Sequence, residues 1–144
     1  MKVKVVNKSN HDLPSYSTID SAGMDIRANM DTPLTIKPLE RTIIKTGLFL
    51  ELPVGYEAQV RPRSGLAFKK GITVLNSPGT IDADYRGEIK IILINHGKKI
   101  FIIERGMRVA QLIISKIEKI KWNEKKKINQ KTKRKESGFG STGL

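Results

Sequence analysis

The chain of 144 residues contains no cysteine and only two histidines, His11 and His96. Without cysteine it can form neither a disulfide framework nor a cysteine-ligated metal site, and two isolated histidines do not make a zinc site. We expect both histidines at the surface. Residues 1–6 alternate lysine with valine and lack the apolar stretch of about 7–15 residues that marks a signal peptide. We therefore expect a cytoplasmic protein without a membrane partner.

Acidic residues are also few, and the net charge of +13 is concentrated in one segment. Residues 116–135 contain ten Lys or Arg side chains against Glu118 and Glu124, a net charge of +8. Trp122 is the only aromatic residue of this segment, and a single ring is no stacking platform for a series of bases. A solvated lysine-rich linker explains the charge better than specific nucleic-acid binding does. A basic nucleic-acid-binding β-domain is the alternative from a different functional class.

Short runs rich in Val, Ile and Thr recur between turn residues, a pattern that predicts an all-β sandwich or barrel. The length is that of a single domain, which we place at residues 1–117. A lysine-rich linker follows over 118–137 and a glycine-rich arm over 138–144. One short helical turn is expected at 64–68. Strands are expected at residues 3–7, 23–28, 34–36, 42–52, 56–61, 71–74, 87–95, 99–103 and 108–117.

Two carboxylates, a phenol and a guanidinium lie between two glycines in the segment Gly79-Thr80-Ile81-Asp82-Ala83-Asp84-Tyr85-Arg86-Gly87. In an extended segment Asp82 and Asp84 point to the same face, as metal ligands or a general base require. Aspartate is also common in turns, where its side chain bonds nearby backbone amides. Both interpretations stay open from the spacing alone.

Three further polar positions lie at predicted strand ends or within apolar strands. Arg63 and Ser64 follow a strand and begin the helical turn, where free backbone amides and the arginine fork could bind phosphate. A serine cap beside solvated arginines is an equally weighted alternative. Asp25 lies among alternating apolar residues and needs a cationic partner, for which Arg134 is a candidate. Gln111 also lies in an apolar strand, where by itself it indicates an edge position more than a ligand.

Residues 138–144, Gly-Phe-Gly-Ser-Thr-Gly-Leu, carry a GxGxxG pattern outside the strand-and-helix context of a dinucleotide fold. Such a composition buries too little apolar surface to order the segment, so we expect a flexible arm when no ligand is bound. Its amides and hydroxyls suit phosphates and Phe139 suits a flat ring, which together describe a nucleotide. A frayed terminus without function is the alternative.

Taken in chain order, these segments resemble the five motifs of the trimeric deoxyuridine triphosphatase (dUTPase) family. The similarity begins at residues 13–18, continues through Ala22-Gly23-Met24-Asp25 and ends in the glycine-rich arm. The resemblance implies a jelly-roll-like β homotrimer with three sites at subunit interfaces. It implies Mg²⁺-dependent hydrolysis of dUTP to dUMP and pyrophosphate by water attack on the α-phosphorus. That reaction keeps uracil out of DNA and supplies dUMP for thymidylate synthesis.

The resemblance also implies roles residue by residue. Asp82, rather than Asp84, is then the base that activates the attacking water. Tyr85 packs beneath the deoxyribose and excludes a ribose 2′-hydroxyl, while Asn76 binds the uracil edge. Asp25 orients the water shell of the magnesium ion and pairs with Arg134, which borders the arm. The remaining substrate contacts, to the phosphates and to the uracil face, fall on Arg63, Ser64, Gly65, Gln111, Phe139, Gly140, Ser141 and Thr142.

Two features depart from the family pattern. Ser137 stands where the family usually has glycine, and Lys135-Glu136 follow Arg134 where glycine is common. The lysine-rich linker has no counterpart in the pattern. A deoxycytidine triphosphate deaminase or a bifunctional relative is a second enzymatic interpretation, because it shares the fold. The chain resembles these proteins less, because they lack this arm and carry a glutamate near the Arg-Ser motif, where this chain has Leu66-Ala67-Phe68.

Overall fold

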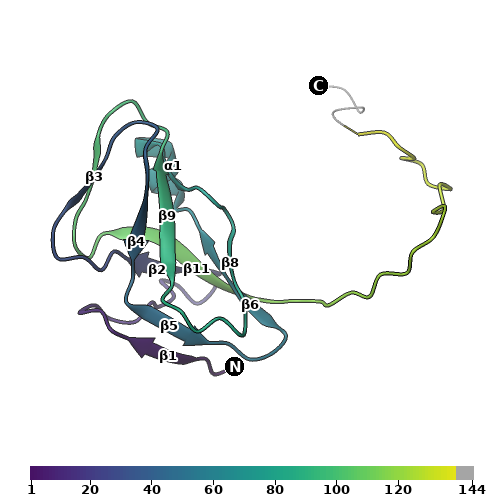
Figure 1. Cartoon of the computed structure of the whole chain (residues 1–144), viewed down its shortest axis with the longest axis horizontal. Coiled ribbons are helices and arrows are strands. Elements are labelled where there is room, and N and C mark those ends of the chain that lie inside the picture. Colours follow the sequence, from purple (N-terminus) through teal and green to yellow (C-terminus); the bar gives the residue numbers. More distant parts are fainter. Residues whose placement is uncertain (139–144) are drawn as a thin grey trace.

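The computed structural model describes residues 1–138, which form eleven strands and one helix (Figure 1). The strands are β1 (Lys4–Asn7), β2 (Met24–Arg27), β3 (Leu34–Ile36), β4 (Arg41–Lys45), β5 (Leu48–Glu51), β6 (Tyr56–Arg61), β7 (Ile72–Val74), β8 (Gly79–Ile81), β9 (Lys90–Asn95), β10 (Phe101–Ile103) and β11 (Arg108–Lys116). The helix is α1 (Ser64–Lys70). The predicted all-β fold is confirmed.

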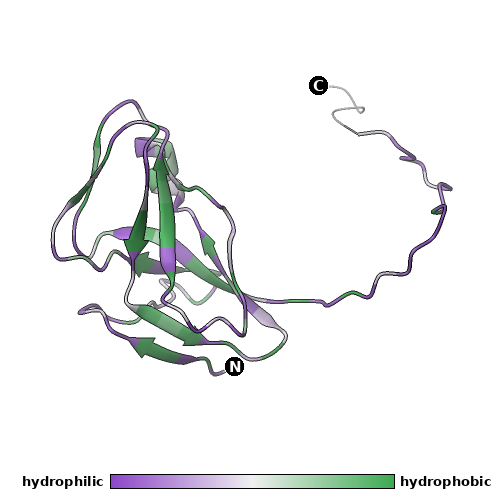
Figure 2. Ribbon diagram, viewed as in Figure 1, coloured by the Kyte–Doolittle hydropathy of each residue, from purple (hydrophilic) through white to green (hydrophobic). Residues whose placement is uncertain are grey.

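All pairings between these strands are antiparallel. A four-stranded sheet has the order β2-β11-β6-β8, and a three-stranded sheet has the order β4-β9-β7. Two further pairs are β1 with β5 and β10 with β3. Along β9, alternate side chains are buried, as expected where one face of a strand packs on the core. Isoleucine, leucine and valine from both sheets make up most of that core, and Figure 2 shows these apolar strands within the body.

Three local predictions differ from the structure. The expected strand 42–52 is divided at Thr46 and Gly47, where Gly47 has a φ of +71° and the buried Thr46 hydroxyl donates to Ile89 O at 2.6 Å. The chain thereby passes from pairing with β9 to pairing with β1. Strand β8 was not predicted, because its three residues include a glycine and precede a turn. The helix runs to Lys70, beyond the predicted single turn, and ends at Gly71 in the left-handed conformation.

The body ends where β11 ends. Ile117 N–H donates to Gly55 O at 2.9 Å, and residues 118–137 are exposed and contain no helix or strand (Figure 1). No helix within residues 1–138 has the length and apolar character needed to cross a membrane. One surface prediction is wrong, because His11 is half-buried against Gly106, whereas His96 is exposed as expected.

Asn95, which is fully buried at the end of β9, joins the connection between β3 and β4 to the loop between β9 and β10. Its amide Nδ2 donates to Ile36 O and to Lys99 O, both at 2.9 Å, and its Oδ1 accepts from Gly97 N–H at 2.8 Å. The backbone of Asn95 also bonds the loop before β4, through its carbonyl and N–H groups. A buried amide with all of these partners fixes the loops relative to one another.

Asn95→Ala should lower the free energy of unfolding by about 2–4 kcal/mol, because it leaves buried backbone groups of Ile36 and Gly97 without partners. Urea denaturation at constant protein concentration measures the change. Asn10→Ala, at an exposed position, is the matched control and should change the stability by less than about 0.5 kcal/mol. Equal effects of the two substitutions would contradict this role of Asn95.

Candidate functional site

The polar residues selected from the sequence form two groups on the four-stranded sheet. The helix group surrounds the end of β6 and the start of α1, and the hairpin group flanks β8. The helix group comprises Asp25, Arg63, Ser64, Gly65 and Gln111, to which the structure adds Arg108. The hairpin group comprises Asn76, Asp82 and Tyr85.

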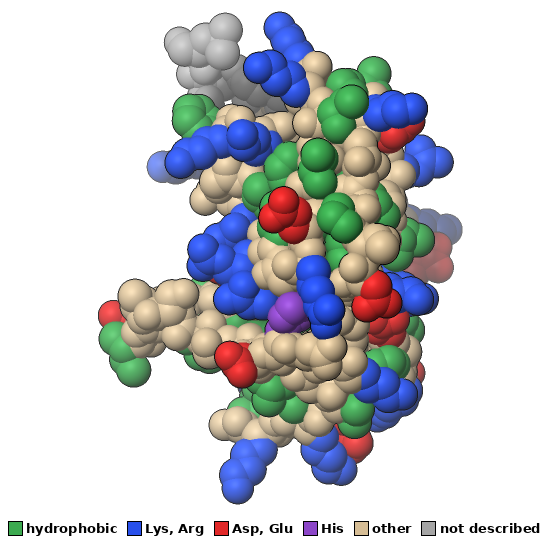
Figure 3. All heavy atoms as spheres, turned by 90° about the vertical axis from the view of Figure 1, so that its left-hand side faces the viewer, with side chains coloured by type: hydrophobic (Ala, Val, Ile, Leu, Met, Phe, Trp, Pro, Cys, Tyr) green, Lys and Arg blue, Asp and Glu red, His purple; other side chains and the backbone are tan. Residues whose placement is uncertain are grey.

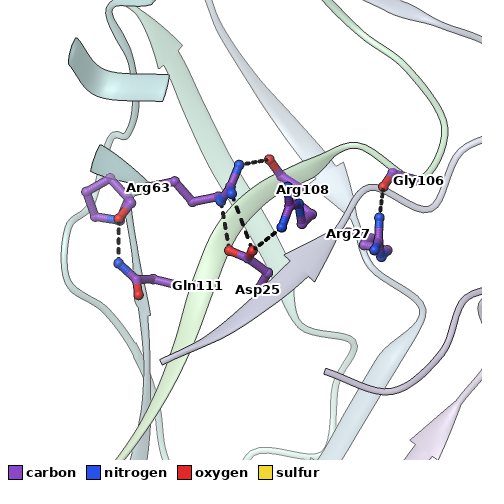
Figure 4. A network of polar contacts seen from close by, with 7 residues as sticks. Asp25, Arg27, Arg63, Gly106, Arg108 and Gln111 are labelled. Atoms are coloured by element: carbon purple, nitrogen blue, oxygen red, sulfur yellow. Dashed lines mark hydrogen bonds and ion pairs between the residues drawn. The ribbon is translucent and has the colours of Figure 1, made fainter. Parts of the chain in front are cut away.

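Asp25 holds two arginines of the helix group in place (Figure 4). Arg63 Nε donates to Asp25 Oδ1 at 2.7 Å, Arg63 Nη2 to Oδ2 at 3.3 Å, and Arg108 Nη1 to Oδ2 at 3.2 Å. Arg63 Nη1 also donates to Arg108 O at 3.2 Å. The expected partner Arg134 is not used within this chain, since its Nε donates to Ser137 O at 2.9 Å. The Asp25 and Arg63 side chains are each 27% exposed, so the fork is partly shielded from water.

Gln111 lies in the centre of the sheet, not at an edge as expected, because β11 pairs with both β2 and β6. Its Nε2 donates to Pro62 O at 3.0 Å, which turns the amide toward the start of α1 (Figure 4). Gly23 makes this position possible, since a Cβ at residue 23 would lie 2.4 Å from Gln111 Oε1. The glycine before β2 thus helps to orient a side chain on β11.

Ser64 is the first residue of α1, and its side chain is exposed. The residue at the N-cap is Arg63, which makes no side-chain capping bond, so the alternative of a serine cap is wrong. A helix of seven residues contributes little macrodipole, so an anion bound here depends on the Arg63 guanidinium and the Ser64 hydroxyl. A Cβ at Gly65 would meet no atom within 4 Å, which leaves open space beside these groups.

Asp82 and Tyr85 lie on a turn after β8, so the extended geometry considered for Asp82 and Asp84 is wrong. Tyr85 N–H donates to Asp82 O at 3.1 Å, and Tyr85 OH donates to Glu88 O at 3.1 Å. The phenol ring lies over Gly87, where a Cβ would come within 2.2 Å of the hydroxyl oxygen. At the other end of β8, the Asn76 amide lies near Gly79, where a Cβ would come within 3.2 Å of its Nδ2.

Asp82 is exposed and borders two hollows. One, of about 260 Å³, is shared with Tyr85 and has apolar walls from Ile43, Ile81 and Ile92. The other, of about 710 Å³, also contains Glu51 and Arg86. A hydrogen bond from Lys4 lowers the pKa of the Glu51 carboxyl, which keeps it ionised. Asp82 is thus open to solvent and to a ligand in either hollow.

The strand register separates Asp82 from the helix group. Ile81 pairs with Ala58 on one side of β6, whereas Gln111 pairs with Arg61 on its other side. A shift of about four residues along the strands and two strand spacings across them places the Cα atoms of Asp82 and Gln111 about 16 Å apart. The Gln111 amide is directed still further away, toward Pro62. A single chain therefore does not bring Asp82 and Gln111 to one phosphate group.

The remaining candidates are only partly covered by the structure. Phe139, Gly140, Ser141 and Thr142 lie outside the described residues. Arg134 is exposed in the linker and contacts neither group. Residues 1–138 contain no cluster of three or more His, Cys, Asp or Glu side chains that could hold a metal ion.

Arg108 is the residue of the helix group that sequence reasoning missed. The sequence indicates that Asp25 needs a cationic partner, but it points to Arg134 in the linker rather than to Arg108. The signal that could have found it was an arginine at the start of the apolar strand that contains Gln111, because Gln111 is the cross-strand partner of Asp25 in the pairing of β2 with β11.

Comparisons with known proteins agree in one family. The chain matches the family model described as dUTPase over residues 9–143. It is 56% identical over 144 residues to the deoxyuridine 5'-triphosphate nucleotidohydrolase of Rickettsia felis, with 100% of this chain and 97% of that protein covered. The protein of the same name from Cytophaga hutchinsonii is 55% identical over 141 residues, with 98% of this chain and 91% of that protein covered. Among solved structures, the Staphylococcus bacteriophage 80alpha dUTPase with dUPNHPP has a TM-score of 0.86 and 25% identity, and 99% of each chain is covered.

Gly23→Ala should destabilise the chain by about 1–2 kcal/mol, because its Cβ displaces the Gln111 side chain. In a Gln111→Ala background the same substitution should cost less, since the atom it meets is gone. A double-mutant cycle of unfolding free energies isolates this coupling, expected at about 1 kcal/mol. Strict additivity of the two substitutions would show that Gly23 does not position Gln111.

Proposed function

This chain belongs to the dUTPase family, and from that premise we propose how its residues hydrolyse dUTP to dUMP and pyrophosphate. The observation that carries the proposal is the extent of the family match, which runs from residue 9 to residue 143 and so includes the helix group, the hairpin group and the arm. The strands form the jelly-roll-like fold of the structurally similar dUTPases. Location in the cytoplasm stays a prediction from the sequence.

We propose that each active site combines the hairpin group of one chain with the helix group of a neighbour in a homotrimer. The separation of Asp82 from Gln111 within one chain supports this arrangement. A base that aims water at the α-phosphorus and an amide that binds the α-phosphate must contact the same phosphate group. A second chain can bring its own Gln111 and Arg63 to the Asp82 turn without distorting the sheet.

Asp82 is proposed to accept the proton of the attacking water. Its exposed carboxylate borders the hollow that Tyr85 also lines, so a water molecule can lie between it and the α-phosphate. The water oxygen bonds to the α-phosphorus as the bond from this phosphorus to the bridging oxygen breaks, and pyrophosphate leaves in line with the attack. The products are dUMP and pyrophosphate, and no covalent intermediate with the protein is needed.

The phosphates are proposed to bind the helix group. The Arg63 guanidinium, held by Asp25 and Arg108 O, presents a fixed positive charge, and the Ser64 hydroxyl and Gly65 backbone lie beside it. The open space beside Gly65 allows a phosphate to approach the backbone closely. Gln111 is proposed to donate to the α-phosphate.

The nucleoside is proposed to lie along the hairpin group. Asn76 binds the uracil edge, and Tyr85, held over Gly87, packs beneath the deoxyribose and leaves no room for a 2′-hydroxyl. The arm then completes the site with Arg134 and with Phe139 on the uracil ring. Gly140, Ser141 and Thr142 are proposed to close over the β- and γ-phosphates and to exclude water.

The donor set fits a magnesium ion that is held mainly by the triphosphate and by water. Magnesium retains several water ligands and commonly binds protein through one or two carboxylates, so the absence of a carboxylate cluster in residues 1–138 is consistent with it. Asp25 Oδ1 accepts one hydrogen bond from the described residues, which leaves a lone pair for a water of the ion. When bound, the ion would neutralise charge on the phosphates.

The wild-type protein should release pyrophosphate from dUTP far faster than from dTTP, dCTP or UTP. A site that pairs polar groups with the uracil edge leaves them unmatched against cytosine, a penalty of order 10⁴-fold. Asp82→Asn should lower kcat for dUTP by roughly 10²–10⁴-fold, the usual contribution of a general base. The matched control Asp84→Asn removes a carboxylate from the same turn and should have a much smaller effect.

A pyrophosphate assay and an ammonia assay on the same reactions distinguish the alternatives. Comparable turnover of dTTP would reject the proposed specificity, and ammonia release from dCTP would indicate a deaminase. A larger loss in Asp84→Asn than in Asp82→Asn would show that Asp84 is the base.

Mixed trimers of the Asp82→Asn and Gln111→Ala chains should be more active than either variant alone. If the hairpin group and the helix group come from different chains, some mixed sites contain both an intact Asp82 and an intact Gln111. Co-expression with two affinity tags, purification of the heterotrimers and a pyrophosphate assay measure the recovery.

The control pair is Asp82→Asn with Tyr85→Ala. Both substitutions lie in the hairpin group, so every mixed site receives one defective hairpin group and activity should not recover. Recovery in the control pair, or none in the first pair, would refute the shared site.

A further inference from the structure

Three loops at the α1 end of the body form a continuous surface that the proposed reaction does not use. This loop cap consists of residues 37–41, from the end of β3 to the first residue of β4, residues 68–71 at the end of α1, and residues 96–100 between β9 and β10. The buried Asn95 bonds the first and third loops through Ile36 O, Lys99 O and Gly97 N–H. Figure 1 places α1 at the end of the body away from the N-terminus.

The second loop is fixed to the third by a close backbone contact. His96 N–H donates to Gly71 O at 2.8 Å. A Cβ at Gly71 would lie 2.5 Å from Gly97 N, and a Cβ at Gly97 would lie 2.4 Å from Lys70 O. Only glycine at both positions allows this approach, so the cap is a rigid surface rather than three independent loops.

The loop cap carries a strong positive charge. Its acidic residue Glu40 accepts a hydrogen bond from Lys37 N–H and lies 4.0 Å from Lys37 Nζ. The net charge of its three segments is +5. The exposed basic side chains are Lys37, Arg41, Lys69, Lys70, Lys98 and Lys99.

Three large apolar side chains project from the same loops. Leu39 is 76% exposed, Phe68 is 90% exposed and Ile100 is 59% exposed. In the sequence these residues are isolated, and folding brings them to one end of the body. Figure 3 shows Lys and Arg side chains beside hydrophobic ones at the upper end of the molecule.

Leu39 is held in an unfavourable backbone conformation. Glu40 N–H donates to Lys37 O at 3.1 Å, so residues 37–40 form a β-turn with Pro38 and Leu39 at its centre. Leu39 has a φ of +65°, in a turn position that glycine or asparagine normally occupies. An exposed leucine gains no burial in return for this strain, which points to a function of the side chain outside the body.

We propose that the loop cap binds the surface of an anionic lipid bilayer. The lysines and the arginine pair with lipid phosphates, while Leu39, Phe68 and Ile100 enter the interfacial layer. A nucleic acid would also attract the lysines, but Leu39 and Ile100 have no ring to stack on a base. A bilayer surface accommodates both the charges and the aliphatic side chains.

Sedimentation of the full-length protein with vesicles tests this proposal. Vesicles of phosphatidylcholine with phosphatidylglycerol should bind the protein, and vesicles of phosphatidylcholine alone should bind it much less. Lys98→Gln and Lys99→Gln together should weaken binding by about 25-fold, because each lysine near an anionic surface contributes about fivefold. The matched control is Lys125→Gln with Lys126→Gln in the linker, which makes the same charge change and should weaken binding less.

Leu39→Gly separates insertion from charge. It should raise the thermal stability, because glycine relieves the positive φ, and yet weaken vesicle binding several-fold through the lost side chain. Hydrolysis of dUTP should be unchanged in solution.

Three results would overturn the proposal. One is equal binding to neutral and anionic vesicles, and another is a loss of binding in the linker variant as large as in the cap variants. The third is binding of a single-stranded oligonucleotide that depends on Lys98 and Lys99, together with vesicle binding that is unaffected by Leu39→Gly.

Discussion

The antiparallel register of β6 with its two neighbours is the constraint on which the site depends. Strand β8 lies on one side of β6 and β11 on the other. Asp82 follows the residue that pairs with Ala58 near the start of β6, whereas Gln111 pairs with Arg61 at its end, so the two residues lie near opposite ends of β6. Loop movement alone would not correct that displacement, because both positions are tied to the hydrogen-bonded core of the sheet. In the proposed arrangement, a folded chain is therefore not yet a complete site, and catalysis would require assembly of the trimer.

Most of the fold could be predicted because its strands are short runs rich in Val, Ile and Thr between turn residues. The break between β4 and β5 could not, since Leu48 and Phe49 continue the apolar pattern and only the contact of Thr46 with Ile89 O, from a distant segment, shows the change of partner. Strand β8 was missed because its three residues include a glycine and precede a turn. The end of α1 carried a usable signal in Gly71, a helix-terminating glycine.

The candidate site could likewise be predicted only in part from the sequence. Residues within one motif, such as Asp82 and Tyr85, could be selected because local chemistry distinguishes them. The contacts that hold site residues in position could not be predicted, because these contacts depend on long-range strand pairing that no local pattern specifies. The pairing of Asp25 with Arg108 follows from the register of β2 with β11, and the space that Gly23 leaves for Gln111 follows from the same register. A glycine can thus leave the space that a site side chain occupies, and the sequence alone does not show which side chain that is.

The carboxylate of Asp25 has a consequence for how long a ligand stays bound. It already neutralises part of the charge of Arg63 and Arg108, so an incoming polyanion meets a cluster of lower net charge than the arginines alone would offer. Two unopposed guanidinium groups would hold a triphosphate and its products alike, and binding that does not discriminate between them slows product release without lowering the barrier. In the proposed site, an internal competitor for the arginines would shorten the residence of both, so the side chain that orders the cluster would also favour turnover.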